Sequence, residues 1–411
     1  MKSKRPEVQM GRMEFVALMA VMFATIAFSI DAMLPALPEI AAEIGGDAPH
    51  RAPLILSFFV LGMGLGTFIA GPLSDAFGRR PIVFVGSALY IAAAAVAWQS
   101  HSLELMLAAR LFQGLGAAGP RVVAVAIVRD LYSGRQMARI VSIVMMIFSL
   151  IPAFAPALGA LLIQFFDWRA IFLAFILFSG FSLCWFALRQ RETLPPHKRR
   201  PVRFGLIFES LVEIFTNRTV RLSIFVQTLA MAMLFVTLML VQPIYDHVYD
   251  RAESFPYWFG VVAILAAGSS LINALLVVRL GMRRLITFAF ATQIILSGLY
   301  LLLGLGSGPY GFVFFVLWQT CMFFQAGLTL GNLNALAMEP MGHIAGTAAS
   351  VIGAVSTVLA AAIASPIGLL FDGTLRPLLI AVLVMSCAAF VMMRRVKRYE
   401  IVFRHREFPD L

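Results

Sequence analysis

Asp31 and Arg110 each stand inside a long apolar run of this sequence. Asp31 lies in the run at residues 15–38, and Arg110 lies in the run at residues 104–127. A charge placed there costs about 2.5–3.5 kcal/mol on insertion scales unless it is paired or faces water, which favours a functional role. A carboxylate whose charge follows its surroundings can carry a proton, whereas a guanidinium remains a fixed cation. The other interpretations are a structural helix-end contact for Asp31 and a static salt bridge for Arg110.

The composition explains why charges inside apolar runs are unusual here. The chain has 411 residues, of which 61% are hydrophobic and 13% are charged. Soluble domains carry about 45–50% apolar and about 25% charged residues. The composition therefore excludes a set of soluble domains, a disordered chain, a coiled coil and a disulfide-rich secreted scaffold. It predicts an all-α membrane protein.

Runs long enough to cross a membrane recur along the whole chain. A bilayer core about 30 Å thick needs about 20 apolar residues in a helix. Twelve runs meet this length, and Gly and Pro interrupt many of them, as spanning helices tolerate. We expect twelve transmembrane helices in two six-helix bundles. The runs are 15–38, 52–72, 81–99, 104–127, 138–163, 169–188, 222–246, 256–278, 285–306, 309–336, 346–370 and 376–393.

The segments that join these runs alternate between rich and poor in Lys and Arg. Most of the 32 Lys and Arg residues fall at the two ends of the chain and in every second loop. By the positive-inside rule, this asymmetry predicts that both termini are cytoplasmic. The net charge of +11 is therefore assigned to membrane topology and not to nucleic-acid binding. The first apolar run is too long for a signal peptide, so we expect an uncleaved first helix.

The middle of the chain separates two halves. Residues 189–203 are polar, basic and proline-bearing, and residues 204–216 form an amphipathic pattern that predicts a short helix along the inner surface. We therefore expect an N-terminal bundle at 1–188, a cytoplasmic linker at 189–221 and a C-terminal bundle with a basic tail at 222–411. The Gly-Arg-Arg sequence after the second run has a faint counterpart at 279–284. Parallel six-helix repeats around a central cavity are one architecture of secondary transporters.

The loop after the second run, residues 71–81, reads GPLSDAFGRRP. It resembles the signature loop of the major facilitator superfamily, with Ala76 at a position that is basic in the signature. Residues 110–119, 152–159 and 167–169 resemble further stretches of the drug/proton antiporter branch, most closely the Bcr/CflA exporters that confer resistance to bicyclomycin and chloramphenicol. The resemblance is dense in the N-terminal half, and the C-terminal half agrees with it in layout.

This resemblance implies roles for three groups of residues. Asp31 and Arg110 would couple protons to transport. A conformational latch would form when the cytoplasmic side closes, with Arg79 or Arg80 on Asp130 and with Asp75 at the start of the eleventh helix near Gly346; ordinary anchoring at the membrane face is the alternative. A proline kink in the fifth span would shape the seal between the halves. The latch residues are Gly71, Asp75, Gly78, Arg79, Arg80 and Asp130, and the kink residues are Pro152, Pro156 and Gly159.

Polar side chains in mid-span are candidates for substrate binding. Gln113 lies three residues after Arg110 and shares its helical face. Arg121 follows Pro120 near the middle of the fourth span, and it either faces a cavity or extends toward the cytoplasmic surface. Amides also join helices routinely, so each candidate has a structural alternative. The candidates in the C-terminal half are Gln227, Asn273, Gln319 and Asn332.

The sequence thus predicts a secondary transporter that exports small amphipathic compounds in exchange for protons, by alternating access. A proton-symporting importer of a small metabolite is the alternative. A membrane enzyme is disfavoured because no span carries GxSxG, HExxH or paired carboxylates, and a channel or sensor lacks a recognisable filter or extramembrane domain. We expect no metal and no cofactor. The expected partners are the substrate, protons and lipid, with a monomer in the bacterial inner membrane.

Overall fold

The computed structural model describes residues 10–199 and 204–407, and no strand occurs among them. Twelve of the described helical segments are long and apolar enough to cross a membrane. The predicted all-α fold and the predicted number of spans are therefore confirmed. The helices are α1 (Arg12–Asp31), α2 (Leu37–Ile44), α3 (Leu54–Phe77), α4 (Arg79–Trp98), α5 (Leu103–Leu131), α6 (Gly134–Phe165), α7 (Arg169–Arg189), α8 (Phe204–Thr216), α9 (Arg218–Pro243), α10 (Phe255–Leu280), α11 (Met282–Leu303), α12 (Gly311–Met338), α13 (Ala345–Gly368) and α14 (Arg376–Glu407).

The chain divides into two compact units. The first contains Met1–Phe204 together with Glu253–Gly260, and the second contains Gly205–Ala252 together with Val261–Leu411. Helix α8 covers the residues for which the sequence predicted a short amphipathic helix. Its placement on the inner membrane surface and the three predicted domain ranges stay predictions.

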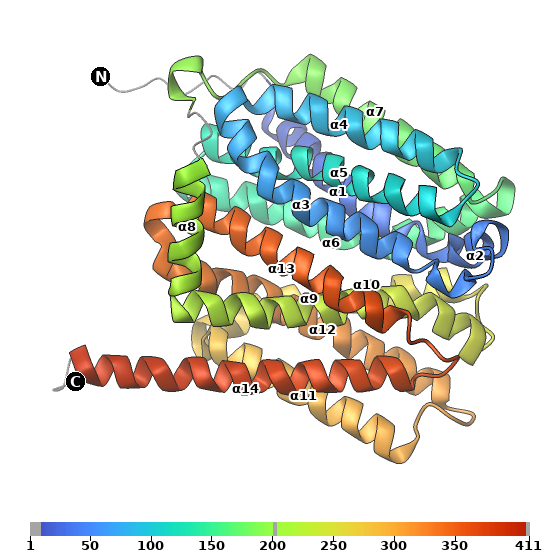
Figure 1. The fold of residues 1–411 in the computed structure, drawn as a ribbon. Coiled ribbons are helices and arrows are strands. Elements are labelled where there is room, and N and C mark those ends of the chain that lie inside the picture. Colours follow the sequence, from blue (N-terminus) through green and yellow to red (C-terminus); the bar gives the residue numbers. More distant parts are fainter. Residues whose placement is uncertain (1–9, 200–203, 408–411) are drawn as a thin grey trace. The chain divides into compact units, whose positions relative to one another are not determined.

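Helix α5 is the centre of the first unit, where it packs along both α3 and α4 (Figure 1). Glycines make this close packing possible. A Cβ built on Gly62 of α3 or on Gly114 of α5 would collide with the backbone of the facing helix, and Gly116 likewise approaches the backbone of α4. Small residues let spanning helices approach closely where apolar burial gives no net drive in lipid. This packing brings side chains of α5 against α1, α3 and α4.

Helix α9 has the corresponding place in the second unit, where it packs against α12, α13 and α14. Its side chains are buried along most of its length, from Val220 to Gln242. Helix α11 packs against α12 and α14. Amide and hydroxyl groups, and no charged groups, make up the buried polar side chains that the structure describes in this unit.

The turns before α4 and α11 have the same backbone conformation. Gly78 precedes α4 with φ 104° and ψ 166°, and Gly281 precedes α11 with φ 80° and ψ 150°. Only glycine adopts this region without strain. The two Gly-Arg-Arg-like segments noted in the sequence therefore form equivalent turns in the two halves.

Candidate functional site

Arg110 lies at the centre of a buried polar cluster in the first unit. Its side chain is fully buried on α5, and its guanidinium lies 4.3 Å from the centre of the Phe59 ring. Nη2 donates to the carbonyl oxygen of Ser29 at 2.9 Å, and Nε donates to that of Ile55 at 3.3 Å. Nη1 donates to Oε1 of Gln113 at 2.7 Å. Because Ser29 lies in the last turn of α1, the cation lies at the negative end of that helix.

Ser29 and Tyr90 extend this cluster to α4. The Ser29 hydroxyl lies within hydrogen-bond distance of the Thr25 carbonyl oxygen and of the Tyr90 hydroxyl. Because the carbonyl can only accept, the single proton of Ser29 goes to Thr25, and Tyr90 donates to Ser29. Tyr90 is 1% exposed. Helices α1, α3, α4 and α5 are thus joined around one cation, which has no carboxylate partner among the described residues.

Asp31 is the last residue of α1, two positions after Ser29, and it is 4% exposed. Within residues 10–199 and 204–407 the structure gives it no hydrogen bond and no ion pair, so Asp31 does not form the static salt bridge that was the alternative interpretation for Arg110. Arg110 instead binds the backbone that leads to Asp31. The coupling role of both residues stays a prediction.

Helix α6 meets α1 beside Asp31. A Cβ built on Gly159 would collide with the carbonyl oxygen of Ala32, the residue after Asp31. The predicted kink motif therefore contacts the end of α1 that carries the acid. Helix α6 continues through Pro152 and Pro156 as one helix, and their predicted role in a kink is not tested by this contact.

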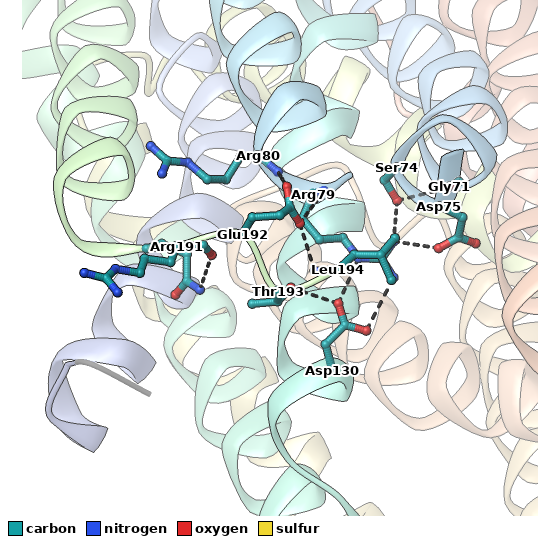
Figure 2. A network of polar contacts seen from close by, with 11 residues as sticks. Gly71, Ser74, Asp75, Arg79, Arg80, Asp130, Arg191, Glu192, Thr193 and Leu194 are labelled. Atoms are coloured by element: carbon teal, nitrogen blue, oxygen red, sulfur yellow. Dashed lines mark hydrogen bonds and ion pairs between the residues drawn. The ribbon is translucent and has the colours of Figure 1, made fainter. Parts of the chain in front are cut away.

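The loop between α3 and α4 forms the second polar cluster, shown in Figure 2. Arg79 is 3% exposed, and its Nε donates to Oδ2 of Asp130 on α5 at 2.9 Å. Its Nη1 donates to Oδ1 of Asp75 at 2.6 Å and to Oγ of Ser74 at 2.8 Å. The Ser74 hydroxyl in turn donates to the carbonyl oxygen of Gly71 at 2.9 Å. The structure thus assigns the contact with Asp130 to Arg79.

Arg80 points elsewhere. Its Nη2 donates to the carbonyl oxygen of Ala187 on α7 at 3.0 Å, and its guanidinium lies 5.6 Å from the centre of the Phe84 ring. Arg80 therefore fits the anchoring interpretation. The capping of the eleventh span by Asp75, and the function of these residues as a conformational latch, stay predictions.

Gln113 and Arg121 differ in their surroundings. Gln113 is fully buried; its Oε1 accepts from Arg110, and its Nε2 has no hydrogen-bond partner in the described part of the chain. Arg121 is half-buried, and its Nη1 lies 4.0 Å from Sδ of Met63. Gln113 thus orients Arg110. A substrate-binding role for either residue stays a prediction.

The amides of the second unit form two kinds of arrangement. Asn332 on α12 donates to Oδ1 of Asn273 on α10 at 2.6 Å and to the Leu328 carbonyl oxygen at 2.8 Å. This pair joins two helices, as buried amides commonly do. Gln319 accepts from the Tyr245 hydroxyl at 3.0 Å through Oε1, while its Nε2 is buried and has no partner among the described residues. Oε1 of Gln227 on α9 is also buried without a partner there.

Three residues of these clusters were not among the sequence candidates. Tyr90 looks like an ordinary aromatic residue of an apolar run. Glu192 and Thr193 belong to the basic segment that follows α7, and they contact Arg79, Arg80 and Asp130 (Figure 2). The feature of the sequence that could have indicated Glu192 is that it is an acidic residue within the basic segment 189–203. The described residues contain no group of three or more His, Cys, Asp or Glu side chains that could hold a metal ion.

Known proteins resemble this chain over nearly its whole length. It is 28% identical to the bicyclomycin resistance protein homolog of Haemophilus influenzae over 372 residues, which cover 89% of this chain and 91% of the relative. It is 27% identical to the multidrug resistance protein MdtL of Shewanella oneidensis over 391 residues, which cover 93% and 95% of the two chains.

Solved structures share the fold at lower sequence identity. A D-xylose-proton symporter superposes with a TM-score of 0.71 at 12% identity, covering 92% of this chain and 97% of the symporter. The sequence also matches the Major Facilitator Superfamily over residues 18–365. The twelve spans, the loop at 71–80 and this match agree, and the chain belongs to the major facilitator superfamily.

Proposed function

We propose that this protein is a proton-coupled secondary transporter that exports small amphipathic drugs or metabolites by antiport, with alternating access. Membership in the superfamily makes it a transporter of small molecules, and the two relatives named above are drug-resistance proteins. The observation that carries the finer proposal is the buried carboxyl group of Asp31, next to the α1 backbone that binds Arg110.

Asp31 is the proposed proton carrier. It lies at the end of α1, within a membrane-spanning segment, and the described residues offer it no hydrogen bond or cation. The ionisation of such a group depends on what faces it, because water and cations stabilise the charged form and apolar surroundings do not. Exposure to one side of the membrane and then to the other would let it bind a proton on one side and release it on the other.

Arg110 is the proposed fixed charge. Neutral groups hold its guanidinium through three hydrogen bonds and an aromatic face, so its position does not depend on a carboxylate partner. A buried cation attracts a carboxylate or an anionic substrate group more strongly than it would in water. Its bond to the Ser29 carbonyl oxygen links the end of α1 to α5, so a shift of α1 changes the surroundings of both charged groups.

Drug and proton are coupled when each binds the two conformations with different affinity. In the proposed cycle, protonation of Asp31 from outside favours the inward-open state, and drug binding favours release of the proton inside. We place the protein in the bacterial inner membrane as a monomer, with both termini cytoplasmic, as the distribution of basic residues favours.

The test reconstitutes the wild type, Asp31→Asn and Asp47→Asn in sealed vesicles with an acidic lumen. Asp47→Asn is the matched control, because Asp47 is exposed and lies outside the spanning segments. A drug panel is added outside, and a trapped dye reports lumen pH. We expect the lumen pH to rise with the wild type and the control, and to respond at least about tenfold more slowly with Asp31→Asn.

Two outcomes would overturn the proposal. Equal proton release by the wild type and Asp31→Asn would remove Asp31 from the coupling. A fall in lumen pH on addition of the transported compound would show symport, and the importer would replace the exporter.

A further inference from the structure

The first residues after α7 bind the loop that contains Arg79. Oε1 of Glu192 accepts from the backbone N–H of Arg79 at 3.0 Å and from that of Leu194 at 2.9 Å. Oε2 of Glu192 accepts from the backbone N–H of Arg80 at 3.0 Å. One carboxylate from the segment that leads toward the second unit therefore receives three backbone donors (Figure 2).

This carboxylate completes the N-terminus of α4. The first N–H groups of a helix have no partner within the helix, and a cap residue usually supplies one. The cap position of α4 is Gly78, which has no side chain to do so, and the third residue is Pro81, which has no N–H. The two donors that remain in the first three positions are those of Arg79 and Arg80, and Glu192 accepts both. Its negative charge also faces the positive end of the α4 dipole.

Thr193 contacts Asp130, the residue that forms an ion pair with Arg79. Its hydroxyl donates to Oδ2 of Asp130 at 2.9 Å, the same oxygen that accepts from Nε of Arg79. Thr193 is 4% exposed and Arg79 is 3% exposed, so water offers little replacement for these bonds. Two consecutive residues thus hold the Arg79 backbone and the carboxylate that its side chain binds.

Gly78 is packed against the same carboxylate. A Cβ built there would lie 2.7 Å from Oε2 of Glu192. The turn therefore needs glycine twice, once for its backbone conformation and once for the space that Glu192 occupies.

We propose that Glu192 and Thr193 are positioning residues of the latch, which set the place of Arg79 through its backbone and through Asp130. Glu192 and Thr193 lie in the segment that connects the first unit to the second. A displacement of this segment would therefore act directly on the ion pair of Arg79 and Asp130. This inference rests on the proposed transport function, and it assigns to the linker a part in controlling the conformational change.

The test compares Glu192→Gln, Glu192→Ala, Thr193→Val and Thr193→Ser with the wild type in nanodiscs. Glu14→Gln is the matched control, since Glu14 forms an ion pair with Arg189 and does not contact the latch. Hydrogen exchange at the amides of Arg79 and Arg80 reports the cap without any need for transport. Loss of a cap hydrogen bond should speed exchange at both amides about fivefold or more in Glu192→Ala.

Glu192→Gln tests the two carboxylate oxygens of Glu192 separately, because only one of them remains an oxygen. Its amide oxygen can still accept from Arg79 and Leu194, but its NH2 group then faces the N–H of Arg80, so exchange should rise mainly at Arg80. Asp130→Asn should also speed exchange at both amides if the cap and the ion pair form one unit, although the structure shows no bond between Asp130 and Glu192.

Transport supplies the second readout. Because neither residue is proposed to touch substrate, the maximal rate should fall about fivefold to tenfold in Glu192→Ala and about threefold in Thr193→Val, while KM changes less than about twofold. Thr193→Ser should restore the rate, since it retains the donor.

Several results would overturn the inference. These are unchanged exchange at Arg79 and Arg80 in Glu192→Ala, unchanged exchange in Asp130→Asn, faster exchange with an unchanged maximal rate, or the same effects in Glu14→Gln. A wild type that exchanges no drug for protons would instead refute the proposed function, and the exchange data for Glu192→Ala and Asp130→Asn would still decide whether the cap and the ion pair act together.

Discussion

The two units differ in the polar groups that they bury. Among the described residues, the buried charged side chains are those of Asp31, Arg79 and Arg110, and all three belong to the first unit. The second unit buries amides, hydroxyls and phenols instead, such as Gln319 with Tyr245. The two halves share the glycine turn before α4 and α11, but they differ in whether they bury charged side chains.

This difference indicates a division of labour between the halves. A buried charge responds strongly to its surroundings, because its stability depends on partners and on water. A buried amide needs hydrogen bonds but does not change charge. We therefore expect substitutions in the first unit to alter coupling and conformational change, and substitutions in the second to alter mainly packing and the shape of the binding site.

Removal of Arg110 should give the largest contrast. Arg110→Met removes the donor that reaches the carbonyl oxygens of Ser29 and Ile55, and it leaves Oε1 of Gln113 buried without a donor, which costs about 1–3 kcal/mol. We expect drug-driven proton release to fall at least about 100-fold, whereas Gln319→Met, which removes one acceptor of the Tyr245 hydroxyl, should slow it about fivefold or less. Initial rates in vesicles and unfolding temperatures measure both effects. Equal losses would show that buried charge does not distinguish the units.

The equivalent turns at Gly78 and Gly281 allow a closer comparison of the two units, with a smaller expected effect on transport. Gly78→Ala and Gly281→Ala both force a side chain into a strained backbone region, at about 1–3 kcal/mol. At Gly78 the new Cβ also meets Glu192 and Arg199, while at Gly281 nothing lies within 4 Å. We expect transport to fall about tenfold in the first variant and about threefold in the second. Similar losses in the two variants would mean that the turn conformation matters and its neighbours do not.

Two helix contacts should give the smallest difference. Gly159→Ala pushes against the backbone of α1 at Ala32, whereas Gly327→Ala pushes against the side chain of Ser269 on α10. A backbone yields less easily than a side chain, so overpacking should destabilise the first variant by about 1–3 kcal/mol and the second by about 1 kcal/mol or less. Unfolding followed by tryptophan fluorescence compares them. A larger loss in Gly327→Ala would reverse the expected order.

Much of the fold followed from simple patterns. Run length predicted the twelve spans, since a helix must satisfy its own backbone groups across a fixed thickness of lipid. The loop at 71–80 indicated the superfamily, and the contact between Arg79 and Asp130 was one of the two pairs expected from it.

Other features were out of reach of such patterns. Nothing in the sequence indicated that Arg110 binds the carbonyl oxygens of Ser29 and Ile55, because backbone acceptors carry no residue signature. The pairing of Asn273 with Asn332 depends on the register between α10 and α12. Helices α4 to α7 lie between Arg79 and Glu192 in the sequence. Only the tertiary structure therefore shows that Glu192 contacts Arg79.

The amino-acid sequence by itself determined which segments cross the membrane and where charges enter them, because hydropathy and chain length are local properties. The tertiary structure alone decided which of those charges have partners. Close packing at glycines sets the distances between helices, and hydrogen bonds form only over about 3 Å, so small shifts between helices choose the partner of each buried group.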